Sequence, residues 1–154
     1  IIYLGGMMRL STRGRYGTRL MFEFALHYGE GYIQLGDVAK RQGISEKYLS
    51  KLVLPLKASG FINSARGFKG GYSLARKPET ITLREIVEAL EGRITPVDCV
   101  MDEALCGQSN NCPTRFVWCE LAETIQESLN GISLKDLVDR FQIKNRELEI
   151  DYSI

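Results

Sequence analysis

The stretch LGDVAKRQGISEKYLSKLVLPL, residues 35–56, decides the fold of this 154-residue chain. Its first part, LGDVAKRQ, predicts a short helix that Gly43 ends, because glycine accepts the left-handed backbone that closes many helices. Ser45 is a good N-cap for a second helix, in which apolar residues then recur at helical spacing. Pro55 removes a hydrogen bond from this second helix, so we expect a kink near its end. A short helix, a glycine-containing turn and a capped helix together predict a helix-turn-helix.

Directly after the second helix, the sequence predicts a β-hairpin. Two short β-like segments, residues 61–64 and 72–74, flank the stretch ARGFKGG, residues 65–71. This connecting stretch is rich in glycine and basic residues, which suits the tip of a hairpin. A helix-turn-helix that is followed by such a hairpin predicts a winged helix-turn-helix.

Four further helices are predicted from caps and turn residues. Pro113 suits the first position of the longest of them. The expected helices cover about residues 12–28 with Ser11 or Thr12 as the cap, residues 83–91 between Thr82 and Gly92, residues 113–130, and a short final stretch from Ser133 to Phe141.

The net charge of only +1 hides a division of the chain into a basic and an acidic half. Residues 8–77 carry 13 Lys or Arg and 4 Asp or Glu, which is a net charge of +9. Residues 78–154 carry 7 Lys or Arg and 15 Asp or Glu, which is a net charge of −8. An asymmetry of this size usually separates a nucleic-acid-binding part from a part with another role.

The overall composition is that of an ordinary globular chain, with 44% hydrophobic and 25% charged residues. No apolar run approaches the roughly 20 residues that a membrane helix needs, so we expect no membrane contact. Residues 1–6 are apolar, but they are too short for a secretory signal and lack its basic start. We interpret them as an extension before Met7 or Met8, and we expect a cytoplasmic protein.

The basic half contains the side chains that we expect to contact double-stranded DNA. A recognition helix reads bases with residues near its N-terminus, where Lys donates to guanine and Glu accepts from cytosine. In the wing, basic residues suit the minor groove or its phosphates, and glycines let the backbone come close. The candidate DNA-binding residues are Arg9, Ser11, Arg13, Arg15, Ser45, Glu46, Lys47, Tyr48, Ser50, Lys51, Arg66 and Lys69.

Four cysteines, Cys99, Cys106, Cys112 and Cys119, lie within 21 residues at the spacing C-x6-C-x5-C-x6-C. In the cytoplasm, clustered cysteines favour metal or redox roles over structural disulfides. Zinc sites usually contain C-x2-C pairs, which this chain lacks, whereas spaced cysteines in a loop rich in Gly and Asn can wrap an iron–sulfur cluster. Pro113 at the first helical position would place Cys112 at the N-cap, where the helix dipole stabilises a thiolate. A cluster, a zinc site and a thiol-based switch are the three interpretations, in that order.

Several motifs strongly resemble the Rrf family of bacterial winged helix-turn-helix transcription regulators, including its IscR-like members, which are iron–sulfur cluster regulators. The resemblance covers roughly residues 8–141. The motifs are MRLS (8–11), GRY (14–16), QGIS-x-x-YL (42–49), RG-x-x-GGY (66–72), and C-x-T (112–114) with Trp118.

Together with the predicted elements, the resemblance implies a fold class that is mainly α with a small β-hairpin wing. It also implies a homodimer in which the long C-terminal helix mediates dimerisation. The expected organisation is a winged helix-turn-helix DNA-binding domain over 8–77, a connecting helix over 78–92, a cluster-binding cysteine loop over 93–112, and the dimerisation helix with the short terminal helix over 113–141.

The resemblance further implies that the ligands of the cluster are Cys99, Cys106 and Cys112. A 2Fe-2S cluster follows from the IscR resemblance, and three cysteines with an open fourth position could equally hold 4Fe-4S. The family positions for a fourth ligand are occupied here by Arg115 and Arg15, and arginine cannot ligate a metal. Cys119 is a doubtful fourth ligand, because seven helical residues place it about 10.5 Å beyond Cys112. It suits a small buried hydrophobic position better.

Other sources of a fourth ligand are a solvent molecule, an exogenous thiol or a group of the partner chain. The only histidine, His27, lies late in the first helix, and we interpret it as structural.

The favoured hypothesis is a transcription regulator, in the first instance a repressor, that senses redox or iron state through its cluster. The cluster would control its affinity for an operator in front of cluster-assembly or iron and redox genes. The alternative is a cluster-free regulator of cysteine metabolism that acts through a partner protein. We do not expect an enzyme such as a thiol-based oxidoreductase, because the chain has no C-x-x-C motif and no nucleotide-binding glycine loop.

Overall fold

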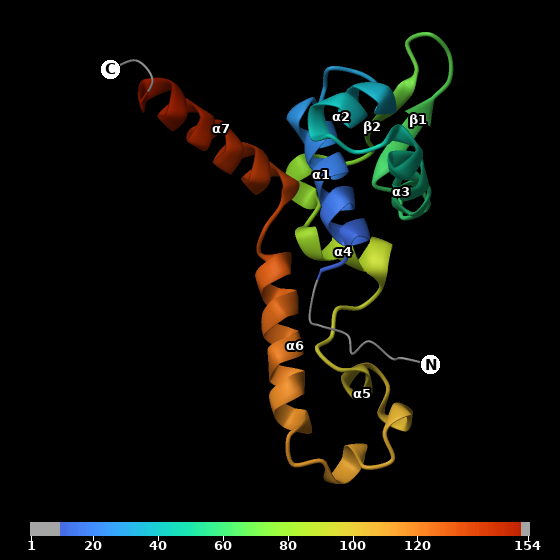
Figure 1. The fold of residues 1–154 in the computed structure, drawn as a ribbon, viewed down its shortest axis with the longest axis vertical. Helices are drawn as coiled ribbons and strands as arrows, with labels where there is room; N and C mark the ends of the chain where they lie inside the picture. Colours follow the sequence, from blue (N-terminus) through green and yellow to red (C-terminus); the bar gives the residue numbers. More distant parts are fainter. Residues whose placement is uncertain (1–9, 152–154) are drawn as a thin grey trace.

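The computed structural model describes residues 10–151, which form a helical body with one hairpin and a helical arm (Figure 1). This confirms the predicted class, mainly α with a two-stranded wing. Arg9 and the opening residues 1–6, which the sequence analysis singled out, lie outside the described residues. The helices and strands are α1 (Thr12–Leu26), α2 (Leu35–Gln42), α3 (Glu46–Ala58), β1 (Ile62–Ala65), β2 (Gly71–Leu74), α4 (Leu83–Glu91), α5 (Asp98–Met101), α6 (Arg115–Asn130) and α7 (Leu134–Asp151), with short 3-10 turns at Pro78–Thr80, Glu103–Leu105 and Ser109–Asn111.

Helices α2 and α3 form the predicted helix-turn-helix. Gly43 ends α2 in the left-handed conformation, with φ of +62°, and its N–H donates to the carbonyl of Ala39. Ser45 caps α3 by accepting a hydrogen bond from the backbone N–H of Tyr48 at 3.2 Å. Helix α3 continues through Pro55 to its last residue, Ala58. The apolar residues of α3 that the sequence placed inward, Leu49, Leu52, Val53 and Leu56, are buried.

Strands β1 and β2 pair antiparallel, from Ile62 opposite Leu74 to Ala65 opposite Gly71. The hairpin is attached to the body through a further bridge, in which Ile33 and Tyr72 exchange two backbone hydrogen bonds of 2.9 and 2.8 Å. Gly71 makes this approach feasible, because a Cβ atom there would lie 2.3 Å from the carbonyl oxygen of Ile33. The wing is therefore held against the connection between α1 and α2.

One hydrophobic core joins α1, α2, α3 and the hairpin with α4 and the first half of α7. From α4 and its approach, Ile81, Ile86 and Leu90 are buried, and from α7 Leu134 and Val138. The predicted boundary at residue 77 therefore marks a change of charge within the chain, whereas the hydrophobic core extends across it.

The last helix is longer than predicted. The sequence analysis expected a short helix to Phe141, but α7 has 18 residues and ends at Asp151. Its start is well capped, since the Asp136 carboxylate accepts from the Ser133 N–H at 2.8 Å and the Ser133 hydroxyl accepts from the Asp136 N–H at 3.1 Å. The Ser133 hydroxyl and N–H hold the pKa of Asp136 below its usual value. Phe141 packs edge-on against Phe22 of α1, with the ring centroids 5.1 Å apart, so tertiary contact supports α7 at the predicted end point.

Residues 93–130 form an arm that extends from the body in Figure 1. The sequence analysis expected a cysteine loop over 93–112, and this segment contains α5 and two 3-10 turns, with Cys99 in α5. We call residues 93–114 the cysteine lobe. Helix α6 runs back alongside it toward the body. Among the described residues, no helix is both long and apolar enough to cross a membrane.

Helices α1 and α4 approach each other closely at two glycines of α1. A Cβ atom at Gly14 would lie 2.1 Å from Oε1 of Glu91, and one at Gly17 would lie 2.0 Å from Cδ1 of Leu90. The same Glu91 oxygen accepts hydrogen bonds from the backbone N–H groups of Ser11 at 3.1 Å and Gly14 at 2.8 Å. The first turn of α1 contains no acidic residue. Glu91 therefore supplies, from α4, the negative charge that a helix N-terminus favours.

We expect Gly14→Ala to lower the free energy of unfolding by about 1–2 kcal/mol, because the new methyl group displaces the Glu91 carboxylate from its hydrogen bonds. In a Glu91→Ala background, the same substitution should raise stability by up to about 1 kcal/mol, since alanine is the better helix former. Urea unfolding of the four proteins at one concentration, followed by circular dichroism, measures both effects. An equal effect of Gly14→Ala in the two backgrounds would contradict the role given to Glu91.

Candidate functional site

The exposed face of α3 carries most of the side chains that the sequence predicted to read DNA. Glu46, Lys47, Ser50 and Lys51 are all exposed in the first turns of this helix. Ser45 is also exposed, but its hydroxyl already accepts the capping hydrogen bond. Tyr48 is half-buried and packs edge-on against Tyr16 of α1, with a centroid distance of 5.8 Å, so it joins α3 to α1.

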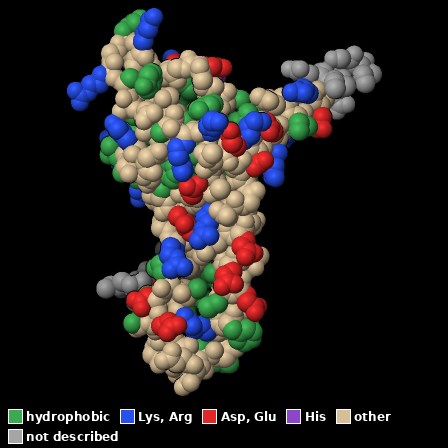
Figure 2. Space-filling model, turned by 180° about the vertical axis from the view of Figure 1, so that it is seen from behind, with side chains coloured by type: hydrophobic (Ala, Val, Ile, Leu, Met, Phe, Trp, Pro, Cys, Tyr) green, Lys and Arg blue, Asp and Glu red, His purple; other side chains and the backbone are tan. Residues whose placement is uncertain are grey.

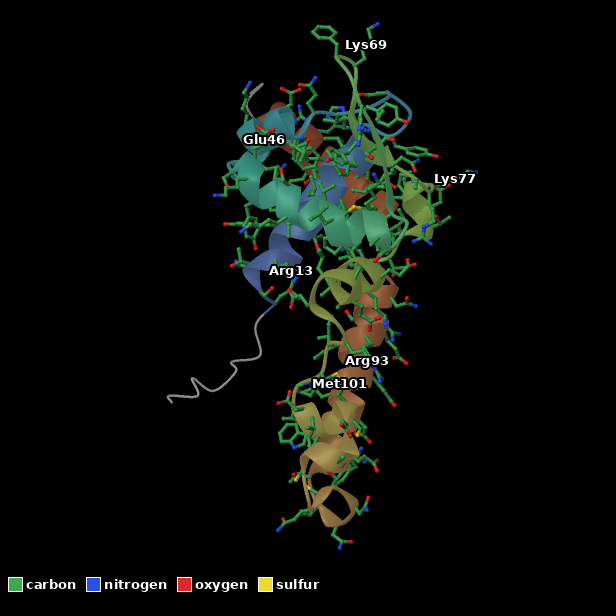
Figure 3. All side chains as sticks on the ribbon, turned by 90° about the vertical axis from the view of Figure 1, so that its right-hand side faces the viewer. Arg13, Glu46, Lys69, Lys77, Arg93 and Met101 are labelled. Atoms are coloured by element: carbon green, nitrogen blue, oxygen red, sulfur yellow. The ribbon has the colours of Figure 1, made fainter. Side chains whose placement is uncertain are left out.

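The wing contributes a second exposed basic segment at the same end of the molecule. Arg66 and Lys69 are exposed on either side of the hairpin tip. A groove separates the wing from the start of α3, and it is lined by Gln34, Glu46, Ser50 and residues of the hairpin between Ala65 and Tyr72. Figure 3 shows Lys69 and Glu46 toward one end of the molecule, and Arg93 and Met101 toward the other. The wing and the recognition helix thus border a single groove.

The start of α1 provides a third group of cations, with Arg13 and Arg15 both exposed. Ser11, which the sequence analysis added to the DNA-binding residues, is exposed, but its hydroxyl already caps α1 and donates to the Glu91 carboxylate. In the view of Figure 2, Lys and Arg side chains predominate around the wing end of the body, whereas Asp and Glu gather over the arm. The basic wing end and the more acidic arm are therefore separated in space, whereas α4 and α7 bring further acidic residues into the body.

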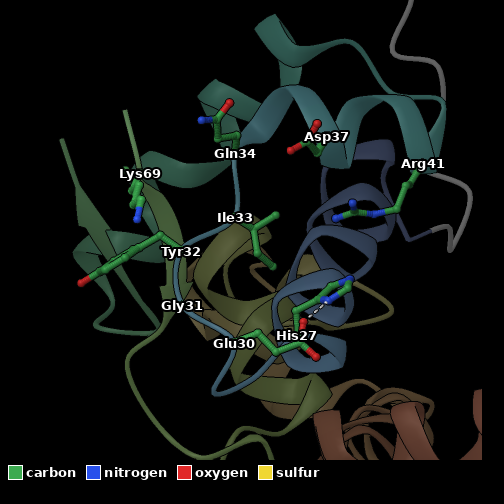
Figure 4. Close-up of a pocket in the computed structure, with 10 residues that line it drawn as sticks. His27, Glu30, Gly31, Tyr32, Ile33, Gln34, Asp37, Arg41 and Lys69 are labelled. Carbon is green, nitrogen blue, oxygen red and sulfur yellow. Dashed lines mark hydrogen bonds and ion pairs between the residues drawn. The ribbon is translucent and has the colours of Figure 1, made fainter. Parts of the chain in front are cut away.

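A second hollow, of about 630 Å³, lies beside the wing between α1 and α2 (Figure 4). His27, Arg41 and Lys69 line it together with the acidic Glu30 and Asp37. His27 Nδ1 lies 2.7 Å from the Glu30 carboxylate, which agrees with its interpretation as a structural residue. Since charges of both signs line this hollow, it has no excess charge that would select an ionic ligand.

The cysteine lobe places the four thiols on different local elements. Cys99 lies in α5, Cys106 and Cys112 each follow a 3-10 turn, and Cys119 lies in α6. All four are free thiols. Within the described part of the chain, no three or more His, Cys, Asp or Glu side chains come together in an arrangement that could hold a metal ion. Cys119 is half-exposed rather than a fully buried hydrophobic residue, which differs from the sequence expectation.

The predicted N-cap position of Cys112 is wrong. Helix α6 begins at Arg115, two residues later than expected, and Thr114 is its N-cap residue. The thiolate of Cys112 is nevertheless favoured, for a different reason. The Thr114 side chain, whose Oγ1 lies 3.5 Å from the Cys112 sulfur, and the Thr114 backbone N–H hold the pKa of this thiol below its usual value, with a smaller contribution from Arg115.

Arg115 has a structural role that the sequence analysis missed. Its Nε donates to the carbonyl of Cys99 at 3.4 Å, and its backbone N–H donates to the carbonyl of Cys112 at 3.4 Å. Its guanidinium also pairs with Glu103 at 2.8 Å. Arg115 therefore links Cys99 and Cys112 with Glu103, which lies between them in the sequence. Arg115 lies 16 positions from Cys99 and 12 positions from Glu103. No local sequence pattern predicts contacts over such separations.

The helix-turn-helix, the hairpin wing and the basic face around them define a winged helix-turn-helix regulator of the DNA-binding class. The chain belongs to the Rrf2 family, since the family model described as an iron-dependent transcriptional regulator matches residues 10–140. This confirms the family resemblance on which the sequence analysis relied.

The chain is similar to several members of this family. It is 43% identical over 131 residues to protein rrf2 of Nitratidesulfovibrio vulgaris. These residues cover 85% of this chain and 87% of that protein. The solved structure of CymR, described as the global cysteine regulator of B. subtilis, matches with a TM-score of 0.73 and 36% identity over 87% of this chain and 98% of CymR. The structure of T. potens IscR matches with a TM-score of 0.71 and 36% identity, over 86% of this chain and 87% of the IscR chain. The family consists of transcription regulators rather than enzymes, as the sequence analysis expected.

We expect Thr114→Val to slow alkylation of Cys112 at neutral pH and to move the midpoint of its pH profile upward. Valine keeps the shape of threonine but removes the hydroxyl that favours the thiolate, which is the reactive form. Iodoacetamide labelling of the metal-free protein across a pH series, with each adduct quantified by mass spectrometry, gives the profile. Cys106 in the same samples is the internal control. An unchanged Cys112 profile would contradict the role of the Thr114 hydroxyl.

Proposed function

We propose that this transcription regulator is a DNA-binding repressor whose operator affinity is controlled by an iron–sulfur cluster held by Cys99, Cys106 and Cys112. The operator would lie before cluster-assembly or iron and redox genes, and the protein would act in the cytoplasm. The main support is the position of the cysteine lobe, which is separated only by Gly92 from Glu91, whose carboxylate holds the first turn of α1. Glu91 ends α4, the lobe begins at Arg93, and the first turn of α1 carries Arg13.

The cysteines suit a cluster by their chemistry, although their side chains do not converge on one point in the described conformation. Three free thiols share one lobe built from short helical turns, and one of them has a pKa below its usual value. Thiolates are the ligands that iron–sulfur clusters use, and a bound cluster would supply sensitivity to redox state and iron supply. Convergence of the three sulfur atoms would require the turns of the lobe to rearrange.

A change in the lobe has a short route to the DNA-binding side of the molecule. The lobe is joined through Gly92 to Glu91, whose carboxylate holds the backbone of Ser11 and Gly14. A shift of this carboxylate would break two backbone hydrogen bonds at the start of α1 and move the exposed Arg13 and Arg15. Since an effector changes an equilibrium only through its differential binding, the forms with and without cluster must differ in their affinity for DNA.

Reconstitution with iron and sulfide under anaerobic conditions tests the ligand assignment. We expect the wild-type protein to gain visible absorption, and Cys99→Ala, Cys106→Ala or Cys112→Ala each to lose most of it. Cys119→Ala is the matched control and should stay coloured. Mössbauer spectroscopy of the same samples distinguishes 2Fe-2S from 4Fe-4S. Anisotropy titrations of loaded and cluster-free protein must then give different DNA affinities, and equal affinities would exclude cluster control.

A cluster-free regulator of cysteine metabolism that acts through a partner protein is the second candidate. The specific observation in its favour is that the chain matches CymR and IscR structures equally well, at 36% identity to each. The absence of a converged metal-binding group among the described residues points the same way. A wild-type protein that stays colourless after reconstitution would favour this candidate.

We further infer that the protein is a homodimer through α6. This 16-residue helix buries only Ala122 among its own residues within the chain. Phe116, Val117 and Trp118 are exposed near its start, with 62% of Phe116 accessible. A helix with this much uncovered apolar surface normally has a partner.

Phe116→Glu should shift the protein from dimer to monomer, because the interface would have to bury an unpaired carboxylate. Sedimentation at several protein concentrations measures the state. Glu123→Lys, at another exposed position of α6, is the control for a general charge effect. A wild-type chain that sediments as a monomer throughout would exclude the dimer.

A further inference from the structure

Phe68 is the most exposed large hydrophobic side chain in the described part of the chain. It is 94% accessible, whereas the aromatic residues Phe24 and Phe61 of the body are almost fully buried. Phe68 lies in the segment that joins β1 to β2, at the tip of the wing. Packing within the chain therefore does not explain the presence of a phenyl ring at this position.

The backbone that presents this ring is held by specific contacts. Gly67 has a φ of +103°, and its carbonyl accepts from the Gly70 N–H at 2.9 Å, which closes the turn. A Cβ atom at Gly70 would lie 2.4 Å from the carbonyl oxygen of Ala65, so the two sides of the tip are in close contact. The side-chain amide of Gln34, at the N-cap of α2, donates to the Phe68 carbonyl at 3.3 Å. The tip is thus tied to the helix-turn-helix, while the Phe68 ring is left exposed to solvent.

The surroundings of the ring are those of a surface that meets a polyanion. Arg66 and Lys69 flank Phe68 and are exposed, and the groove beside the wing leads to Glu46 and Ser50 at the start of α3. When α3 enters a major groove, the neighbouring groove available to the wing is a minor groove. Proteins that bind there combine cations for the phosphates with apolar side chains, Phe among them, that enter between base steps.

We propose that Phe68 is an apolar wedge that packs into the minor groove of the operator, beside the major groove that α3 reads. This inference rests on the proposed DNA-binding function and adds a residue that differs in kind from the charged contacts. Arg66 and Lys69 hold the phosphates on either side, and the ring is removed from water against sugars and base edges. Pyrimidine–purine steps unstack most easily, so the wedge selects such a step at the position that faces the wing.

Binding titrations with Phe68 variants test this proposal. The probe is a fluorescein-labelled duplex that the full chain selects from a random-sequence pool. We expect Phe68→Ala to weaken binding on the order of ten-fold, because it loses apolar burial. The dependence on salt should keep its slope, since no phosphate contact is removed. Arg66→Ala, as the contrasting variant, should reduce that slope by about 0.9 in log–log form. Phe68→Leu should recover part of the affinity, because leucine can also act as a wedge.

A local probe of the DNA separates a wedge from ordinary surface contact. With 2-aminopurine placed at the step that faces the wing, wild-type protein should increase its fluorescence through unstacking, and Phe68→Ala should not. The circular dichroism and thermal midpoint of Phe68→Ala should match wild type, because the ring has no place in the core. Equal DNA affinity of Phe68→Ala and wild type overturns the wedge but leaves DNA binding intact, which would be the result if the ring served a protein partner. Failure of the wild-type chain to select any duplex overturns both.

Discussion

The carboxylate of Glu91 at the N-terminus of α1 is the contact on which the arrangement of this molecule depends. Helix α1 begins with exposed arginines and has no acidic residue in its first turn, so its own sequence leaves the positive end of the dipole uncompensated. Glu91 compensates it from 77 to 80 residues away, at the point where α4 ends and the arm begins. Gly14 and Gly17 make the contact feasible, because any side chain there would collide with α4.

A second polar contact determines how the helix-turn-helix sits on α1. Glu23 is 97% buried in the first helix, and it accepts from Arg41 at 2.8 Å and from the Gln42 amide at 2.6 Å, both at the end of α2. Arg19 donates to Gln42 from the same side of α1. Hydrophobic contacts alone would allow α2 to rotate or slide on α1. A buried carboxylate with two directional donors selects one orientation, because any other would leave a charge without partners.

The two ends of α1 therefore have different roles in the structure. Its C-terminal half holds α2 of the helix-turn-helix through Glu23, and its N-terminal end is linked through Glu91 to the arm that carries the cysteines. The exposed cations of α3 and the wing lie at one end of the molecule and the acidic arm lies at the other, and Arg13 at the start of α1 lies between them (Figure 3). The proposed control of DNA binding by the cysteine lobe and the proposed wedge at Phe68 both use this division. The cysteine lobe would change the position of the cations at the start of α1. The Phe68 wedge would add an apolar contact to DNA beside the cations of the wing.

The sequence by itself determined the elements that local chemistry specifies. Gly43 and Ser45 define the turn, Thr82 and Glu85 form a capping box at the predicted start of α4, and the glycines of residues 65–71 define the tip of the wing. Only the tertiary structure decided the features that depend on distant partners. Pro113 suits a helix start, but α6 begins at Arg115, whose side chain is held by Glu103 and the Cys99 carbonyl. Helix α7 packs on α1 where Phe141 meets Phe22, and Glu91 adds a distant acceptor to the Ser11 cap that the sequence predicted for α1. Contacts such as these join residues from 12 to 119 positions apart, and their free energy is present only when the chain has folded.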